Sequence, residues 1–399
     1  MTILILSITG REKTPYDEWF EDTSERVILF CPTEQKESYS ESQYLRIESF
    51  DHYKDNPNIE MRALALSQQY PITHVLSISE FDVLRAARLR ELLQLEGQSF
   101  ISATAYRDKI LMKQLLQASS VKIPQFDKAI DAEHVRHFVE SQGLPVVLKP
   151  IDGSGSSNVV IAREQSDIDT FLLAHDDLHQ YEIEQYIEGE MYHVDGLIHQ
   201  ASVVCAYVSH YYNGCLSFQD HQPLSSYLLQ KDNPLNMLLQ QEVKKVIATL
   251  PSLPNGSFHA EFFVTSNGDI YFCEIGSRTG GGEIGRTLAF AAGFELNQMS
   301  LKLQLGYDDV LKKVKPLERY AGFVLLPPQN ATYGGIRQSL DESWVVSQTN
   351  KATPGQKFKA AQHSVDVIIS VVVEGENEAV LIERIEQVIA WYHDHVIWY

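Results

Sequence analysis

The sequence predicts an α/β fold made of several lobes, and three observations point to this class. Residues 1–100 alternate apolar strands with helical stretches, which is the βαβ order of a parallel sheet. Further along, apolar residues flank Asn267-Gly268, a dipeptide typical of β-hairpins and therefore of antiparallel pairing. The chain has 399 residues, more than one compact core usually holds, so we expect roughly two to four lobes.

The charge balance excludes one class of partner. Asp and Glu number 53 against 33 Lys and Arg, which gives a formal net charge of −20. A general nucleic-acid binder would repel the phosphate backbone at that charge, so we expect no nucleic-acid partner. A small anionic substrate is compatible, since a few placed cations and a metal ion reverse the field locally.

Cysteine usage and the first residues bear on location. The four cysteines (Cys31, Cys205, Cys215 and Cys273) show no metal-ligand spacing and indicate reduced thiols in a cytoplasmic protein. The apolar residues 2–10 lack a basic region and are too short to span a membrane. We therefore expect a buried first strand and no membrane partner.

The elements of the first lobe, residues 1–100, follow from short apolar runs. Gly10 stands alone after the first run, so the glycine-rich dinucleotide fingerprint is missing and the lobe is expected to be a scaffold. The predicted strands are residues 3–8, 26–30, 43–47 and 74–77, with a helix at 81–95.

A second lobe is expected at residues 101–188. Its predicted elements are a helix at 105–118, a strand at 145–150, a flexible Gly/Ser loop at 152–158, a strand at 159–162, and a strand at 181–187.

A third lobe is expected at residues 189–310 and a C-terminal α+β lobe at 311–399. The third lobe is predicted to hold strands at 191–199 and 201–210, a polar stretch to residue 233, a helix at 235–250, the hairpin around Asn267-Gly268, and helices at 287–292 and 295–305. The C-terminal lobe is predicted to hold strands at 320–326, 344–347 and 365–373 and a helix at 378–393.

The hairpin carries the strongest chemical signal. It brings Glu261 and Glu274 together, with Arg278 just beyond the second strand. Two carboxylates beside a guanidinium are typical of a hard-cation site that clamps a polyphosphate. Cys273 precedes Glu274 and should alternate to the opposite face, so we expect it in the core.

The Gly/Ser loop lies between two strands. A Walker-type loop leads from a strand into a helix, so this loop is not of that type. Its backbone amides and hydroxyls, from Ser154, Gly155, Ser156 and Ser157, suit phosphate oxygens, although an ordinary surface hairpin has the same composition. Lys149 ends the preceding strand and Lys109 starts the preceding helix, and both supply point charges for phosphates. A solvated helix face is the alternative for Lys109.

Other candidates are weaker when taken alone. Glu184, Gln185, Tyr186, Ile187 and Glu190 suit an adenosine site, because strand backbone reads the adenine edge and carboxylates accept from the ribose hydroxyls or the exocyclic amine. His259 shares a strand face with Glu261, which makes a substrate or supporting contact as reasonable as a packing role. His193 and Asp195 are less favoured for either function.

Residues 105–300 resemble the ATP-grasp superfamily in the order of their features, which is the lysines, the Gly/Ser loop, the strand at 181–187, the paired glutamates and Arg278. Lys149-Pro-Ile-Asp-Gly-Ser-Gly-Ser-Ser and Glu274-Ile-Gly-Ser-Arg-Thr-Gly-Gly-Gly look most like its amino-acid ligase group, which includes dipeptide-forming and antibiotic-biosynthesis enzymes. The resemblance implies two sub-lobes whose antiparallel sheets grip ATP, with residues 152–158 as a lid.

The resemblance also implies roles for the candidate residues. Glu261 and Glu274 would ligate Mg²⁺, or Mn²⁺ in its place, while Lys109 and Lys149 contact phosphates. Arg278, Lys149 and His259 are the expected catalytic residues. Gly276 departs from the family pattern, which has Asn there, so the number of bound metal ions stays open.

The implied activity is an ADP-forming ligase that activates a small carboxylate as an acyl phosphate and joins it to an amine. Two alternatives stay open: transfer to the thiol of an acyl carrier protein, and a non-catalytic ATP-binding module. The net charge favours a small amine, because carrier proteins are usually acidic. Substrate contacts are expected around residues 205–230 and 278–290. Superfamily members often pair as dimers, so a homodimer is also an open expectation.

Overall fold

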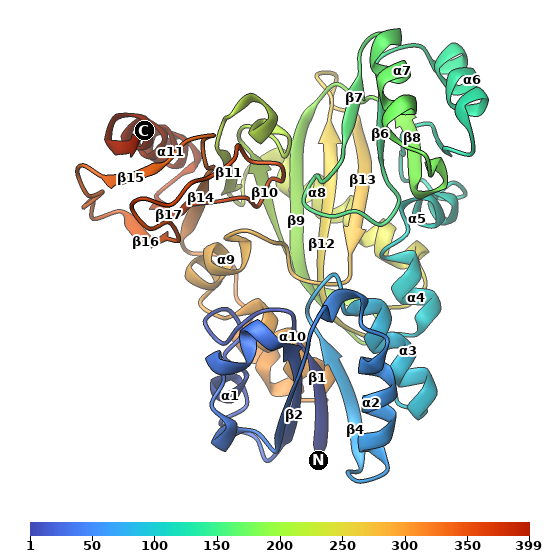
Figure 1. Cartoon of the computed structure of the whole chain (residues 1–399), viewed down its shortest axis with the longest axis vertical. Coiled ribbons are helices and arrows are strands. Elements are labelled where there is room, and N and C mark those ends of the chain that lie inside the picture. The colour runs from blue at the N-terminus through green and yellow to red at the C-terminus, as the bar shows by residue number, and fades with distance from the viewer.

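Four β-sheets organise the chain (Figure 1). The computed structural model describes residues 1–399. In Figure 1 the N-terminal lobe lies at the bottom, a small lobe lies at the upper right, and the C-terminal strands lie at the left. The longest sheet connects the last two regions through the centre of the molecule.

The N-terminal lobe contains the expected parallel sheet, in the order β3-β2-β1-β4. All five residues of β1 are buried, because helices and turns cover both faces of the sheet. The strands are β1 (Thr2–Leu6), β2 (Arg26–Pro32), β3 (Arg46–Phe50) and β4 (Ile72–Ser77), with helices α1 (Tyr16–Trp19), α2 (Asn58–Ser67) and α3 (Val83–Leu93). Helix α2 was not expected, and β3 starts later than predicted because Glu41–Gln43 form a 3₁₀ turn.

A helix from much later in the chain completes this lobe. Leu301 and Leu305, from α10 (Leu296–Gln304) and its C-cap, share a core with Ile3 and Ile5 of β1. Lys302 Nζ also lies 2.7 Å from Asp22 Oδ1. The N-terminal lobe is therefore packed against the large lobe rather than tethered to it.

The small lobe is an antiparallel sheet in the order β5-β8-β6-β7. Its elements are β5 (Phe126–Lys128), α6 (Ala132–Gln142), β6 (Val146–Pro150), β7 (Val160–Ala162), α7 (Gln165–Ala174) and β8 (Tyr181–Gln185). The helix predicted at 105–118 is α5 (Lys109–Leu116), which is shorter at both ends, and α4 (Phe100–Ala105), which was not predicted, precedes it. Asp108 separates them, since its side chain caps α5 by accepting from Leu111 N at 2.9 Å.

The large sheet has eight strands in the order β13-β12-β9-β10-β11-β14-β17-β16. They are β9 (Glu190–His199), β10 (Ser202–Tyr211), β11 (Leu224–Leu228), β12 (Asn255–Val264), β13 (Ile270–Gly276), β14 (Tyr320–Leu326), β16 (Val345–Asn350) and β17 (Ile369–Gly375). Strand β11 lies where a polar connection was expected, and it pairs with β14. The expected boundary at residue 310 therefore falls within one continuous sheet.

Helices cover both faces of this sheet. Helices α8 (Pro234–Thr249) and α11 (Glu378–His395) pack on one face, while α9 (Ile284–Ala292) and α10 pack on the other. A two-stranded sheet of β15 (Tyr333–Ile336) and β18 (Val396–Trp398) closes the C-terminal edge. Short 3₁₀ helices also occur at Thr33–Ser38, Tyr53–Asp55, Leu178–Gln180, Ser217–Asp220 and Asp308–Lys313. Every helix is too short or too polar to cross a bilayer.

A buried lysine fastens α5 to the small sheet. Lys113 is fully buried, and its Nζ donates to Glu182 Oε2 at 2.8 Å and to Glu184 Oε2 at 2.6 Å. Both carboxylates belong to β8 and are also almost completely buried. Neither acid is stable there without a cation, so the contact between α5 and the sheet depends on this ammonium group.

Gly196→Ala should destabilise the large sheet. A Cβ at this position in β9 would collide with the backbone carbonyl of Cys205 and lie 2.8 Å from the ring of Phe258. Because the backbone of a central strand cannot move freely, we expect a loss of about 1–3 kcal/mol in the free energy of unfolding by chemical denaturation. Gly285→Ala in α9 is the control, since its Cβ would make only ordinary contacts. Equal stability of the two variants would contradict this account.

Lys113→Met should destabilise the small lobe by about 3–5 kcal/mol, because it leaves two buried carboxylates short of a counter-charge. Lys122→Met provides the comparison, since Lys122 pairs with Asp269 at an exposed position. Exposed pairs contribute little, so that variant should unfold close to wild type in the same denaturant titration. A Lys113→Met protein as stable as Lys122→Met would show that the buried cluster is not needed for packing.

Candidate active site

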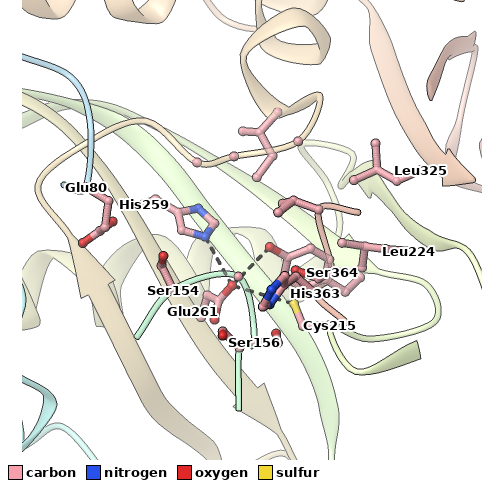
Figure 2. A pocket seen from close by; sticks show the side chains of 18 of the residues that line it. Glu80, Ser154, Ser156, Cys215, Leu224, His259, Glu261, Leu325, His363 and Ser364 are labelled. Carbon is pink, nitrogen blue, oxygen red and sulfur yellow. Dashed lines mark hydrogen bonds and ion pairs between the residues drawn. The ribbon is translucent and has the colours of Figure 1, made fainter. Parts of the chain in front are cut away.

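A large cleft of about 2070 Å³ lies where the lobes meet. Figure 2 shows its wall, with Glu80 from the N-terminal lobe, Ser154 and Ser156 from the Gly/Ser loop, and Glu261 from β12. Apart from His193 and Asp195, the candidate residues that the sequence singles out all line this cleft: Lys109, Lys149, Ser154, Gly155, Ser156, Ser157, Glu184, Gln185, Tyr186, Ile187, Glu190, His259, Glu261, Glu274 and Arg278.

The hairpin prediction is confirmed, and its register contains a bulge. Glu261 pairs directly with Glu274, but Phe262 pairs with Phe272, which leaves Cys273 as an extra residue in β13. The expectation that Cys273 points away from Glu274 is therefore wrong. Its Sγ and carboxylate oxygens of Glu261 and Glu274 all lie within 4.8 Å of one another. Strict alternation fails here because a bulge re-aims the side chain.

Glu274 remains ionised in this setting. Its carboxylate lies 3.1 Å from Lys109 Nζ and is partly exposed to the cleft. Burial by itself would raise its pKa, but Lys109 and Lys149 outweigh burial and lower the pKa of Glu274 to about 2. The hairpin thus presents to the cleft a carboxylate that is charged at neutral pH.

Glu261 is held by a hydrogen-bonded chain. Tyr211 donates its hydroxyl to Glu261 Oε1 at 3.1 Å, and His259 Nε2 lies 3.2 Å from the same oxygen. The other ring nitrogen of His259 lies 2.9 Å from Asp195 Oδ1. Burial opposes protonation of His259, but Asp195 and Glu261 outweigh burial and raise its pKa to about 9. His259 therefore supports Glu261 from behind.

The series of hydrogen bonds continues into the sheet beyond His259. Asp195 Oδ2 lies 2.6 Å from His193 Nδ1, and His193 Nε2 lies 2.7 Å from the hydroxyl of Ser226. Gly280 N donates to Asp195 Oδ1 at 3.3 Å. Asp195 is buried on β9 and contacts His259 of β12 and Gly280 of the glycine-rich turn, so it links these three elements. Sequence reasoning gave the histidine–aspartate pair of β9 little weight because its further partners, Ser226 and His259, lie on other strands.

The donor set fits a hard divalent cation. Glu261 and Glu274 supply facing carboxylate oxygens at the edge of an open cleft, which are the ligands that Mg²⁺ and Mn²⁺ prefer. Position 276 offers no third oxygen, since glycine has no side chain. A Cβ there would lie 3.3 Å from Glu80 Oε2, so the carboxylate of Glu80 lies close beside Gly276.

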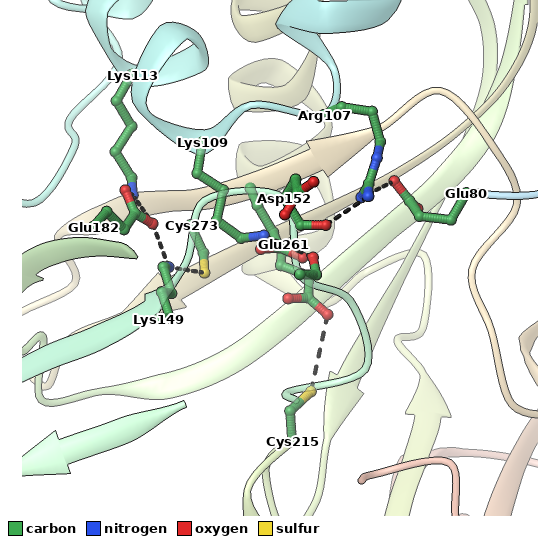
Figure 3. Close-up of polar contacts among 12 residues, drawn as sticks. Glu80, Arg107, Lys109, Lys113, Lys149, Asp152, Glu182, Cys215, Glu261 and Cys273 are labelled. Carbon is green, nitrogen blue, oxygen red and sulfur yellow. Dashed lines mark hydrogen bonds and ion pairs between the residues drawn. The ribbon is translucent and has the colours of Figure 1, made fainter. Parts of the chain in front are cut away.

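Arg278 is positioned by this same Glu80. Arg278 Nε pairs with Glu80 Oε2, while Arg107 Nη1 lies 2.8 Å from Glu80 Oε1. Burial would raise the pKa of Glu80, but the two guanidinium groups lower it below its ordinary value. Figure 3 shows Glu80 reaching Arg107 from a different part of the chain. No local signal around residue 80 marks it as a site residue.

The two expected phosphate lysines have protein partners. Lys149 Nζ lies 2.6 Å from Glu184 Oε1 and 3.4 Å from Glu182 Oε1. Burial lowers the pKa of Lys149, but the surrounding acidic groups, including Glu184 and Glu182, outweigh burial and raise it well above its ordinary value. Lys109 Nζ donates to Gly153 O at 2.8 Å, so it touches the Gly/Ser loop as well as Glu274.

The Gly/Ser loop lies against the C-terminal region. Ser364 N donates to Gly155 O at 3.2 Å. Just after the loop, Val159 O accepts from Gln219 Nε2 of the segment between β10 and β11 at 3.2 Å. Gly155 and Ser156 both have positive φ angles, of 64° and 57°. In Figure 2 Ser154 and Ser156 of this loop appear near Glu261 of β12, with His363 and Ser364 beside them.

The expected adenosine residues lie along another wall of the cleft. Gln185 N donates to Gln125 O at 2.8 Å, and Ile187 is buried. Arg163 lies over the ring of Tyr186 at 5.4 Å. Glu190 is exposed and pairs with His210 at 3.0 Å, so it lies at the rim.

Known proteins resemble this chain in sequence. Residues 142–286 match the model of the ATP-grasp domain. The L-arginine-specific L-amino acid ligase of Bacillus subtilis is 26% identical over 273 residues, which cover 66% of this chain and 64% of that protein. Dapdiamide A synthase of Enterobacter agglomerans is 28% identical over 58% of this chain and 56% of its own length. Both matches thus span less than two thirds of the relative.

Solved structures resemble it over the whole chain. An L-amino acid ligase from Bacillus licheniformis superposes with a TM-score of 0.81 at 18% identity, covering 100% of this chain and 98% of the other. A phosphoribosylglycinamide synthetase from Anaerococcus prevotii has a TM-score of 0.72 at 16% identity, with 100% and 99% coverage. The chain therefore has the ATP-grasp fold, with its ATP-grasp domain at residues 142–286, and it resembles L-amino acid ligases.

Proposed function

We propose that the protein is an ATP-dependent carboxylate–amine ligase acting on amino acids or related small metabolites. The observation that carries the proposal is the pairing of Glu261 with Glu274 beside Lys109, in a cleft that the Gly/Ser loop and Arg278 also line. These groups supply what phosphoryl transfer from ATP needs, namely positioning and charge neutralisation.

Activation of the carboxylate is the purpose of ATP in this proposal. A carboxylate is a poor electrophile, because its charge is delocalised and its oxygen is a poor leaving group. Transfer of the γ-phosphoryl group gives an acyl phosphate and ADP. The amine nitrogen then forms the new bond to the carbonyl carbon, and the bond to the phosphate oxygen breaks. Amide, ADP and phosphate are the products.

Each part of the cleft has an assigned task. Glu261 and Glu274 would hold Mg²⁺, or Mn²⁺, which when bound neutralises phosphate charge. Lys109 and Lys149 would contact the phosphates, and Arg278 would stabilise the oxyanion that forms on the carbonyl. His259 keeps Glu261 oriented. The proposed adenosine residues are Glu184, Gln185, Tyr186, Ile187 and Glu190.

Two structural details refine these tasks. Gly280 N already donates to Asp195, so the backbone donors available to an oxyanion in this turn are those of Gly281 and Gly282. An ATP phosphate at Lys149 would compete with Glu184, whose carboxylate now holds that ammonium group. The Gly/Ser loop would act as a lid, because an acyl phosphate must be kept from water.

The class of substrate is proposed from the relatives. One is named for L-arginine-specific amino acid ligation and the other for dapdiamide synthesis. We therefore propose amino-acid substrates, with a role in the biosynthesis of peptide-like antibiotics as an extension of that proposal.

The proposed function is tested by incubating the full chain with ATP, Mg²⁺ and a panel of amino acids in pairs, with and without an acyl carrier protein. We expect ADP and phosphate release with a dipeptide or amide product for at least one pair. Release only with the carrier protein would support the thiol acceptor instead. The absence of ADP under every pairing would contradict both ligase readings and favour a non-catalytic ATP-binding module.

Glu274→Gln should abolish most of the turnover without unfolding the protein. Loss of one metal-ligating charge removes several kcal/mol of transition-state stabilisation, so we expect ADP formation to fall at least about 100-fold. The Mg²⁺ concentration for half-maximal rate should rise in any residual activity. Glu140→Gln on the exposed face of α6 is the control and should behave like wild type. Near wild-type turnover in Glu274→Gln would refute the metal assignment.

A further inference from the structure

The extra residue of the β13 bulge is a cysteine, and the bulge delivers its thiol to the two facing carboxylates. Cys273 Sγ and the oxygens of Glu261 and Glu274 lie within 4.8 Å of one another, which is a spacing that a single cation spans. Figure 3 shows the Cys273 sulfur in the same cluster as Glu261 and Lys149. A thiol has no place among the oxygen ligands that Mg²⁺ prefers.

A second thiol approaches the same cluster from the opposite side. Cys215 Sγ lies 3.9 Å from Glu261 Oε1, as the dashed line in Figure 3 marks. Cys215 belongs to the segment between β10 and β11, which also lines the cleft. Two of the four cysteines of the chain therefore lie beside the carboxylate pair.

We propose that Glu261, Cys273 and Glu274 form a mixed oxygen–sulfur site that binds thiophilic divalent cations, of which Cd²⁺ and Zn²⁺ are the representatives. Two carboxylates and one thiolate give three protein ligands and leave a fourth position open to the cleft, a common arrangement for zinc. Sulfur ligands select such cations over magnesium. When the thiol becomes a ligand, its proton is released to solvent and one metal–sulfur bond forms.

Neighbouring ammonium groups do not prevent this occupancy. Lys149 Nζ lies 3.8 Å from Cys273 Sγ, but its charge is compensated by Glu182 and Glu184. Lys109 faces Glu274 and is 3.1 Å from it. Each ammonium group thus has its own carboxylate partners, Glu274 for Lys109 and the Glu182–Glu184 pair for Lys149, whichever cation is bound.

Thiophilic cations and Mg²⁺ would therefore compete for the same site. A thiophilic cation would occupy the carboxylates assigned to Mg²⁺ and exclude it, so the protein would be inhibited by such cations. This inference shares Glu261 and Glu274 with the proposed ligase, but direct cation binding is measurable without ATP or turnover.

The test is a Cd²⁺ titration of the metal-free full-length protein, followed by the ultraviolet sulfur-to-cadmium charge-transfer absorption. We expect a saturable band in the wild type that is lost in Cys273→Ser and in Cys273→Ala. Cys205→Ser, on β10 and away from the carboxylates, is the control and should retain the band. Glu274→Gln should weaken Cd²⁺ binding by about tenfold or more. Thermal melts establish that each variant is folded.

Several results would overturn the proposal. They are a wild type without the band, an undiminished band in the folded Cys273 variants, and a band removed by Cys215→Ser but kept by Cys273→Ser. ATP turnover separates this inference from the proposed function. Cadmium binding without any ligase activity would contradict only the proposed function, whereas ligase activity without cadmium binding would contradict only the mixed site.

Discussion

The pairing register of β12 and β13 is the constraint on which the rest of the site depends. Glu261 lies opposite Glu274, so the two carboxylates converge on one face of the large sheet. A shift of one residue in either strand would turn one carboxylate to the opposite face and break the pair. The bulge at Cys273 keeps Glu274 in place while adding a thiol to the same face.

Buried charges around this hairpin occur in compensated groups. Lys113 and Lys149 face Glu182 and Glu184. Arg278 and Arg107 share Glu80, which comes from the N-terminal lobe. At these largely buried positions each group is stable only with its partner. The net charge of −20 therefore says little about the local field, which is set by cations from α5, β6 and the turn after β13.

Much of the fold could be predicted, and the failures have physical reasons. Strand β11 was missed because serines mark its composition as a loop, yet Ser226 is buried beside His193. The helix predicted at 105–118 began too early, because Asp108 caps α5 and sets its first residue at Lys109. Alternation misplaced Cys273, since a bulge depends on the partner strand and not on the residues within β13.

By itself the sequence determined the local elements and the residue types that carry chemistry. The hairpin, the Gly/Ser loop and the lysines at element ends follow from turn chemistry and periodicity, which act over a few residues. Only the tertiary structure decided that Glu80 meets Arg278, 198 residues away, and that Asp195 joins His259 to His193. The first contact arises where separate lobes pack together and the second where β9 pairs with β12, and no local pattern encodes either event.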